Sequence, residues 1–275
     1  MFELKHGNNI NLPLIHRFHE LGYQTYRLIP GLNALVSFDP SQAFDKYRLN
    51  LFACKTDKAQ ELETNGVITP SWVEQAPLPD STLAQDTISQ LAYASALDNV
   101  MHASTSPTQD IYQAIFNAYL LSQSADENMT IRAAYLKFAL TRMQDLLAKG
   151  EASIARLITF SRIAFDAGER SLGISILVHL MNIYREQNEP VIDDLLLPAV
   201  KRYEQIDPES RLHDWLTSSI AEQYILKHAF STYFTGAKTL PLFEELARWG
   251  FMDESMSRRH QLLKSHLSNK QFNKV

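Results

Sequence analysis

The spacing of hydrophobic and polar positions in the first forty residues predicts a small mixed α/β segment. Residues 2–4 form a short apolar stretch, which predicts a strand. Apolar residues then recur at helical spacing from residue 14 to residue 21. Asn11 before them is of a type that caps helices, and Gly22 after them is of a type that ends helices. The segment is therefore predicted to begin as a strand followed by a helix.

Two stretches rich in aromatic and branched residues follow, and they predict a β-hairpin with strands at residues 23–29 and 32–38. Pro30 and Gly31 suit the central positions of a type II turn, because proline presets the first and glycine accepts the positive φ of the second. So small a sheet has exposed edges. We therefore expect residues 41–65 or the helical part of the chain to pack over it, or the sheet to pair with another chain.

Residues 44–65 are predicted to form a helix that ends at Gly66. Three prolines then fall within residues 67–80, a connector that we take as the boundary between domains. The chain is therefore predicted to consist of an amino-terminal domain at residues 1–66, this connector, and a helical domain at residues 81–275.

The chain beyond the connector shows helical periodicity almost throughout. Ser106, Pro107 and Gln109 form a helix start signal, with a serine cap and proline at the first helical position. The buried stripe of that helix is predicted to be Ile111, Ile115, Phe116, Tyr119 and Leu120. Further helices are predicted at residues 131–147, 154–165, 172–184 and 208–234, with a last helix capped by Asp253.

The helices at residues 154–165 and 172–184, joined at Gly168, resemble a tetratricopeptide unit. Ser161 and Gly173 supply the small residues that such a unit needs where its helices cross. The neighbouring helices do not fit a clean period of about 34 residues. The predicted fold is mainly α, with a small α/β remnant (strand, helix and β-hairpin) at the amino terminus, followed by stacked helical pairs.

Composition narrows the class of protein. The net charge of −5 and the pI near 6.0 provide no basic field for nucleic acid or an anionic membrane. Cys54 is the single cysteine, so no internal disulfide can form, which fits a reducing compartment. No apolar stretch approaches the roughly 18 residues that a membrane span needs. We expect a cytoplasmic protein.

The sequence contains no recognisable cofactor or metal motif. Its nine glycines are scattered, whereas loops that cradle phosphates or dinucleotides need glycines close together. His16 and His19 lie one helical turn apart beside Glu20, but nothing indicates a third ligand converging on them, so we interpret them as surface residues. The sequence therefore assigns no catalytic, cofactor-binding or metal-binding residue.

The candidate substrate-facing residues are Glu3, Lys5 and His6, because functional groups in α/β sheets gather beyond the ends of strands. Glu3 and Lys5 are predicted to share one face of a strand, with His6 in the loop that follows. The alternative is an ion pair at a sheet edge and a loop histidine. Cys54 is interpreted as a small packing residue rather than a nucleophile. The aromatic residues from 224 to 234 are interpreted as core rather than a ligand groove.

Several stretches of the chain resemble the carboxyl-terminal end of FkbM-type methyltransferase domains and the helical tail of larger members of that family. They are residues 2–7, 21–23, 26–28, 30–32, 35–36, 50–55, 229–236 and 240–245. The resemblance implies a Rossmann-like sheet that would begin at its fifth strand. The first four strands, the glycine loop for S-adenosylmethionine and the acidic ribose ligand have no counterparts here, so no cofactor is expected unless a separate amino-terminal half supplies it.

Three functions follow as hypotheses. The favoured one is a truncated methyltransferase relative that acts as a helical interaction or substrate-docking module for a protein partner. The alternative is the carboxyl-terminal component of a split S-adenosylmethionine-dependent methyltransferase that acts on a sugar or glycan-linked substrate. The third is a helical scaffold for which residues 1–65 form only a cap.

Overall fold

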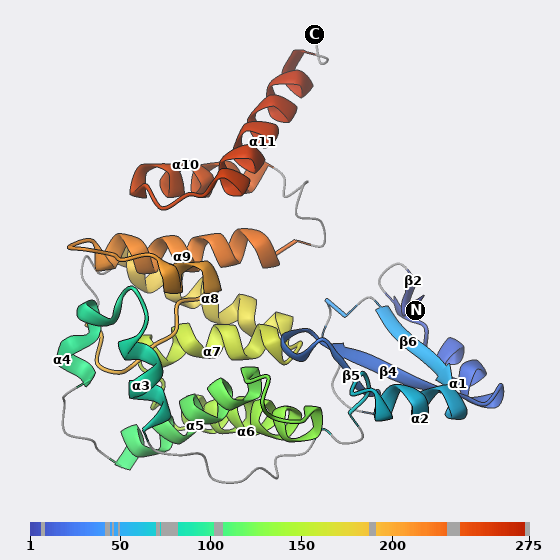
Figure 1. Ribbon diagram of the computed structural model, residues 1–275. Helices are drawn as coiled ribbons and strands as arrows, with labels where there is room; N and C mark the ends of the chain where they lie inside the picture. Colours follow the sequence, from blue (N-terminus) through green and yellow to red (C-terminus); the bar gives the residue numbers. More distant parts are fainter. Residues whose placement is uncertain are drawn as a thin grey trace. The chain divides into compact units, whose positions relative to one another are not determined.

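The structure, a computed structural model, describes residues 1–6, 9–41, 45, 47–48, 50–69, 72, 82–101, 107–186, 191–229 and 237–272 (Figure 1). It is mainly helical with a small antiparallel sheet near the amino end, which confirms the predicted fold class. Two compact units are present, and neither is one continuous stretch. The first contains residues 1–87, 104–152 and 163–173, and the second contains residues 88–103, 153–162 and 174–275. The first unit thus draws on both sides of the predicted connector.

The first unit holds all of the described strands. Its elements are β1 (Phe2–Glu3), β2 (Lys5–His6), β3 (Asn9–Ile10), α1 (Leu12–Glu20), β4 (Tyr23–Ile29), the 3₁₀ helix η1 (Pro30–Leu32), β5 (Ala34–Ser37), β6 (Asn50–Lys55), α2 (Thr56–Thr64), α5 (Pro107–Gln123) and α6 (Met129–Ala148). Helices α3 (Leu83–Ser89), α7 (Ile154–Asp166) and α8 (Arg170–Glu186) contribute residues to both units. The second unit adds η2 (Ala94–Leu97), α4 (Asp98–Met101), η3 (Lys201–Gln205), α9 (Leu212–Lys227), η4 (Ala237–Thr239), α10 (Leu240–Trp249) and α11 (Glu254–Phe272).

The main sheet has the strand order β1-β6-β4-β5, and its neighbouring strands are antiparallel. Strand β6 was not predicted, because residues 44–65 were assigned to one helix. That prediction is wrong for Asn50–Lys55 and right for α2, which ends before Gly66 at φ +69°. The error arose because a short apolar run is compatible with a helix or a strand. In the structure Leu51 and Phe52 pack into different apolar clusters, as neighbours on one strand do.

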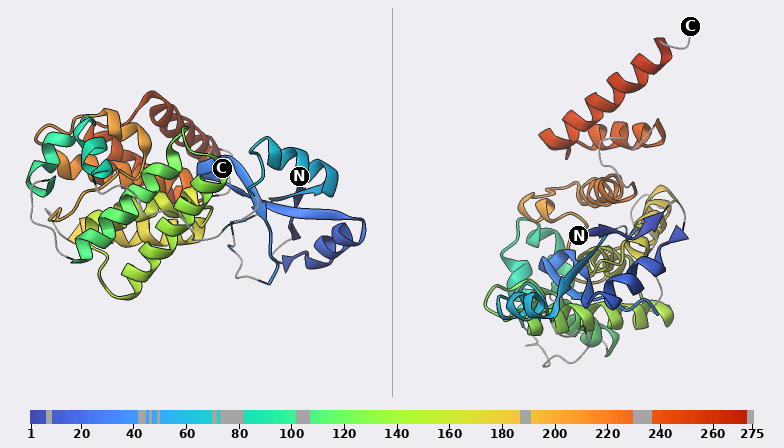
Figure 2. Two further views of the ribbon diagram at one scale, coloured as in Figure 1. Left: turned by 60° about the horizontal axis from the view of Figure 1, so that its bottom comes forward. Right: turned by 90° about the vertical axis from the view of Figure 1, so that its right-hand side faces the viewer.

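Each face of this sheet is covered by one helix, with α1 and α2 on opposite sides in the left view of Figure 2. The cluster on the α1 side consists of Leu4, Ile15, Phe38 and Leu51, and the cluster on the α2 side consists of Tyr26, Leu35, Ala59 and Ile68. The outer edge of β5 is also occupied, because Leu35 N donates to Val67 O at 2.8 Å and Thr69 N donates to Leu35 O at 2.9 Å. The expectation that residues 41–65 pack over the sheet is confirmed for α2.

The turn between β4 and β5 is the 3₁₀ helix η1 rather than the predicted type II turn. The residue with positive φ is Asn33, at 51°, and not Gly31. Gly31 is needed instead for a close approach, since a Cβ at that position would lie 2.4 Å from Asp166 Cβ. A glycine is therefore needed at position 31 because the turn packs closely against Asp166, and not because of the backbone conformation of the turn.

Asp166, at the end of α7, holds the helical part of the first unit against this turn. It accepts a hydrogen bond from the Tyr119 hydroxyl at 2.6 Å, and the neighbouring Ala167 carbonyl accepts one from Arg27 at 3.2 Å. Tyr119 belongs to the predicted stripe of α5, whose central residues are buried, although Ile111 is 45% exposed. The helix start predicted there is confirmed at Pro107, while Ser106 lies outside the described residues.

An extended segment at residues 191–200 lies against α7 in the second unit, where the sequence suggested helix after helix. Three α7 residues one turn apart hold it. Arg156 donates to Asp194 Oδ2 at 2.9 and 2.8 Å, and Thr159 Oγ1 accepts from Leu197 N at 3.0 Å. Arg162 donates to the Pro198 carbonyl at 3.4 Å and pairs with Glu204 in η3, which follows the segment. Each pair is buried, so these tertiary contacts determine the course of a segment that has no periodic pattern of its own.

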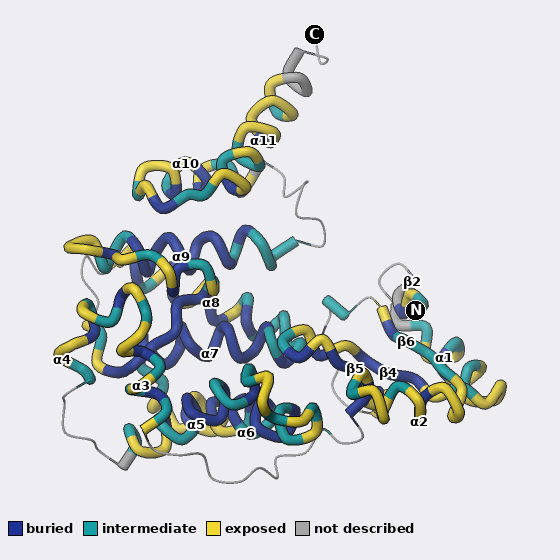
Figure 3. Tube along the Cα trace, viewed as in Figure 1, coloured by how far each residue is buried: buried dark blue, intermediate teal, exposed yellow. Residues whose placement is uncertain are grey.

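Helix α9 is buried along most of its length, whereas α11 is largely exposed (Figure 3). Helix α9 begins at Leu212 rather than near Pro208, so the helix predicted at 208–234 is too long at its start. Helix α9 ends at Lys227, and residues 230–236 lie outside the described residues. Gly250 ends α10 at φ +81°, and Asp253 caps α11 by accepting from Met256 N at 2.7 Å, as predicted. Among the described helices, none combines the length and the apolar character that crossing a membrane requires.

Candidate functional site

The structure separates the three residues that the sequence offered as substrate-facing. Glu3 is exposed in β1, which pairs with β6. Lys5 and His6 belong to β2, which pairs with β3 in a separate two-stranded sheet. The expectation that Glu3 and Lys5 share a strand, with His6 in a loop, is therefore wrong. The reason is that the chain leaves the main sheet at Leu4, which is buried in the cluster under α1.

The histidine pair on α1 matches its interpretation as surface residues. His16 and His19 are exposed, and His19 Nε2 lies 3.1 Å from Thr25 Oγ1. Glu20 pairs with Arg17 at 2.7 Å. No group of three potential metal ligands occurs among the described residues. In the aromatic stretch, the Tyr224 and His228 rings stack at 4.7 Å, while Phe230, Tyr233 and Phe234 lie outside the described residues.

Cys54 packs against the apolar cluster under α2, and burial raises the pKa of its thiol while the Tyr26 hydroxyl opposes that shift. A higher pKa leaves less thiolate at neutral pH, and thiolate is the form that reacts. We therefore expect iodoacetamide at pH 7.5 to alkylate Cys54 roughly fivefold or more slowly than free cysteine. The rate should rise to that of free cysteine in denaturing urea. Alkylation of the native chain as fast as free cysteine would identify a reactive thiol instead.

A pocket of about 250 Å³ lies between α8, α9 and α10 in the second unit. Its apolar lining consists of Met181, Ala221, Leu242 and Trp249. Its polar lining consists of Tyr184, Arg185, His213, Thr217, Glu245 and Arg248. The pocket thus combines an apolar wall with titratable and hydrogen-bonding groups, which is the usual composition of a binding site.

Helical spacing explains how three helices build this pocket. Helix α9 contributes His213, Thr217 and Ala221, which are four residues apart and share one face. Helix α10 contributes Leu242, Glu245 and Arg248 with Trp249, which are three or four residues apart. Helix α8 adds residues from its last two turns in the same way. Each helix therefore presents one stripe, and the pocket lies where the three stripes meet.

Two polar atoms in the lining are buried without a partner. Tyr184 Oη and His213 Nδ1 are both inaccessible to solvent and lack a hydrogen-bond partner among the described residues. Their rings lie 5.3 Å apart. A buried polar group without a partner costs about 1–3 kcal/mol, so such groups in a native protein call for an explanation. Burial raises the pKa of Tyr184, which keeps its hydroxyl protonated and able to donate.

Charged side chains also line the pocket. Arg185 and Arg248 are exposed, and Glu245 is partly buried. The Thr217 hydroxyl donates to the His213 carbonyl at 2.7 Å, so its oxygen can still accept a hydrogen bond from a ligand. Two guanidinium groups against one carboxylate give the lining a positive balance.

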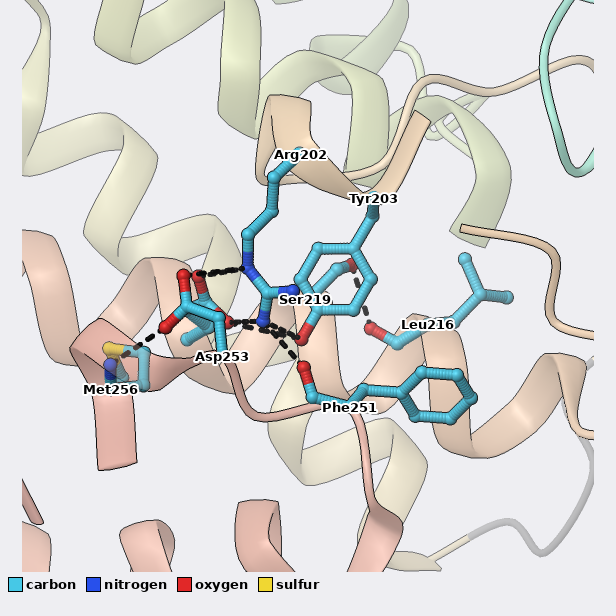
Figure 4. A network of polar contacts seen from close by, with 8 residues as sticks. Arg202, Tyr203, Leu216, Ser219, Phe251, Asp253 and Met256 are labelled. Atoms are coloured by element: carbon cyan, nitrogen blue, oxygen red, sulfur yellow. Dashed lines mark hydrogen bonds and ion pairs between the residues drawn. The ribbon is translucent and has the colours of Figure 1, made fainter. Parts of the chain in front are cut away.

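Arg202 binds the chain just beyond the end of α10, within a network of polar contacts (Figure 4). Its Nε donates to Glu222 Oε1 of α9 at 2.8 Å, and its guanidinium also donates to the Phe251 carbonyl at 2.6 Å. Arg211 adds a hydrogen bond to the Trp249 carbonyl at 3.1 Å. Two arginines therefore bind carbonyls at and just beyond the carboxyl end of α10, where the helix dipole favours positive charge.

Sequence reasoning did not find this pocket. Tyr184, His213 and Arg248 come from three helices spread over more than sixty residues, and no short motif links them. The one usable signal was the presence of polar residues within otherwise apolar helical faces, such as His213 and Thr217 beside Ala221. That signal is common in helices and does not identify a site without the tertiary arrangement.

No protein-family model, curated protein or solved structure matches the chain. The resemblance to FkbM-type methyltransferases therefore stays a prediction. The geometry of the pocket in the second unit is the basis on which a function can be proposed.

Proposed function

We propose that this protein is a helical docking module that binds a polypeptide partner through the pocket between α8, α9 and α10. The observation that carries the proposal is the composition of the pocket, in which an apolar wall formed by Leu242 and Trp249 adjoins charged and hydrogen-bonding side chains. A partner side chain entering the pocket would cover apolar surface of Leu242 and Trp249.

The size of the pocket supports a side chain rather than a cofactor as its occupant. Sites for small ligands and cofactors usually measure about 300–1,000 Å³. At about 250 Å³ this pocket is smaller, and it suits one large anchoring residue of the kind that dominates many protein interfaces. Such an occupant is what the favoured hypothesis, a methyltransferase relative that docks a partner or substrate, requires.

The test compares two tryptophan substitutions. Peptides selected from a display library against the purified chain should bind the wild type with micromolar affinity. Ala221→Trp fills the pocket, because Ala221 lines it and is 1% exposed. We expect a loss of affinity of at least tenfold. Ala247→Trp is the matched control, since Ala247 is exposed on α10 outside the pocket lining, and it should leave affinity within about twofold.

Circular dichroism and thermal unfolding identify a variant that has lost its fold, because Ala221 is buried and a larger side chain can strain the helices. Should Ala221→Trp disturb the fold, Leu242→Ala provides a second variant that removes apolar wall and should weaken binding. Unchanged peptide affinity in a folded Ala221→Trp variant would contradict the proposal.

A second candidate function rests on the sheet of the first unit. Both β1 and β4 are antiparallel to β6, so they run in the same direction, and the chain between them passes through α1. This connection is typical of α/β sheets. Strand β1 lies at one edge of the described sheet, and its neighbour is β6. A strand from a separate amino-terminal half could add there, as the split-methyltransferase hypothesis requires.

A further inference from the structure

We infer that His260 makes the attachment of helix α11 to helix α10 sensitive to acid, so that α11 is released from α10 when the imidazole takes up a proton. This switch goes beyond the proposed function and does not depend on the pocket between α8, α9 and α10. Two observations carry it, namely the position of a titratable ring in the buried face of α11 and the surroundings of that ring.

His260 occupies the centre of the buried stripe of α11. The stripe consists of Met256, His260 and Leu263, which are four and three residues apart and therefore lie on one face of the helix. Met256 and Leu263 are buried, whereas most of the other described side chains of α11 are exposed. A short stripe thus attaches a mainly polar helix, and a titratable residue stands where the helical pattern calls for an apolar one.

The His260 ring stacks on the ring of Phe243 in α10. The two ring centroids are 5.5 Å apart, and the ring planes differ by 5°. Phe243 is buried, and His260 Nε2 is inaccessible to solvent and has no hydrogen-bond partner among the described residues. The N–H bonds of an imidazole lie in the plane of the ring, so in this parallel arrangement they do not point at the face of Phe243. The neutral ring therefore packs here as an aromatic side chain.

A proton on His260 would bring a charge to a place where the described residues offer Nε2 no acceptor. The imidazolium carries an N–H at both ring nitrogens, and the one at Nε2 would stay buried and unpaired. A buried charged donor without a partner costs more than the attraction between a cation and a phenyl ring supplies. Release of α11 from Phe243 removes this cost, because it moves the charged ring into water.

The charged groups around His260 do not compensate such a charge. Among the described residues, Lys264 of α11 repels an imidazolium, and Glu244 of α10 attracts it. Lys264 Nζ and Glu244 Oε1 lie 3.8 Å apart and offset each other, and both side chains are 51% exposed, so their ion pair adds little to the attachment. Burial and Lys264 lower the pKa of His260, while Glu244 opposes that shift.

The direction of the pH effect follows from the lowered pKa of His260. In released α11 the histidine is solvated and regains the ordinary pKa of 6.5, so the released form binds a proton more readily than the attached form. Attachment is therefore complete above about pH 6.5 and weakens as the pH falls below that value. Released α11 should lose much of its helical structure, because a polar helix of 19 residues is marginal in water without its packing.

Amide hydrogen exchange of the full chain at pH 7.5 and pH 5.0 tests the switch. After correction for the intrinsic effect of pH, the protection of α11 should fall at least about threefold at the lower pH, while that of α7 stays unchanged. His260→Phe keeps a ring that can stack on Phe243 but cannot take up a proton, so α11 should stay protected at both pH values. His266→Phe is the matched control, because His266 is exposed on the same helix, and it should keep the response of the wild type.

Equal protection of wild-type α11 at both pH values would overturn the inference, and so would an equal loss of protection in His260→Phe. Proton NMR titration of the His260 ring in the wild type gives a second readout that needs no substitution in the stripe. The ring should titrate below the pKa of free histidine, over the pH range in which α11 loses protection. Titration at or above the pKa of free histidine would show that the attached form does not prefer the neutral ring.

Discussion

Replacing Arg162 with methionine is expected to lower the free energy of unfolding by about 3–5 kcal/mol. The Arg162 guanidinium pairs with the Glu204 carboxylate, and the two side chains are only 10% and 11% exposed. Methionine fills a similar volume but leaves the carboxylate of Glu204 buried without its cation. The large effect comes from that uncompensated charge rather than from lost packing.

The measurement is reversible urea unfolding, followed by the fluorescence of the buried Trp215. The double variant Arg162→Met/Glu204→Leu removes both charges, and it should recover most of the loss, to within about 1.5 kcal/mol of the wild type. Arg142→Met is the control, because Arg142 and its partner Asp145 are about half exposed, and it should change stability by less than about 1 kcal/mol. A loss below about 1 kcal/mol for the single Arg162→Met variant would show that the pair does not anchor the segment after residue 190.

Gly31→Ala is expected to destabilise the first unit by about 1–3 kcal/mol. The φ of Gly31 suits any residue, so the cost is steric. The new Cβ would lie 2.4 Å from Asp166 Cβ and 2.7 Å from Asp166 Cγ, closer than real side chains approach. Relieving the overlap requires the turn to move away from the end of α7, which also disturbs the hydrogen bond between Tyr119 and Asp166.

A double-mutant cycle tests this cause. Asp166→Gly removes the atoms that collide with the new Cβ, so Gly31→Ala should cost less in that background than in the wild type. Thermal unfolding of the four proteins gives the coupling. Additive effects would mean that Gly31 contributes through the conformation of the turn and not through the close approach.

The sequence predicted those elements of the fold that depend on local chemistry. The Asn11 cap, the stop at Gly22, the strand at Tyr23–Ile29 and the Asp253 cap are all present, because each depends on a few neighbouring residues. Strand β6 was missed because a short apolar run such as Leu51–Cys54 is compatible with a buried helix or a strand. Its pairing with β1 and β4 involves residues far away in sequence.

The extended segment at 191–200 and the pocket were not predicted for the same reason, because both depend on contacts between residues far apart in sequence. Arg156 and Thr159 hold that segment through contacts with residues 38 positions further along the chain, which no local pattern reveals. The candidate site was predicted around Glu3 because strand ends are informative in α/β sheets. The structure instead assembles its pocket from His213, Tyr184 and Arg248 on separate helices, so only the folded chain brings them together.

Amide hydrogen exchange of the whole chain, with and without a selected peptide, tests the central claim most directly. The docking proposal predicts slower exchange at the end of α8, across α9 and along α10, and no change at residues 12–64. Protection confined to β1 and β6 would contradict it and would favour strand addition at the edge of the sheet.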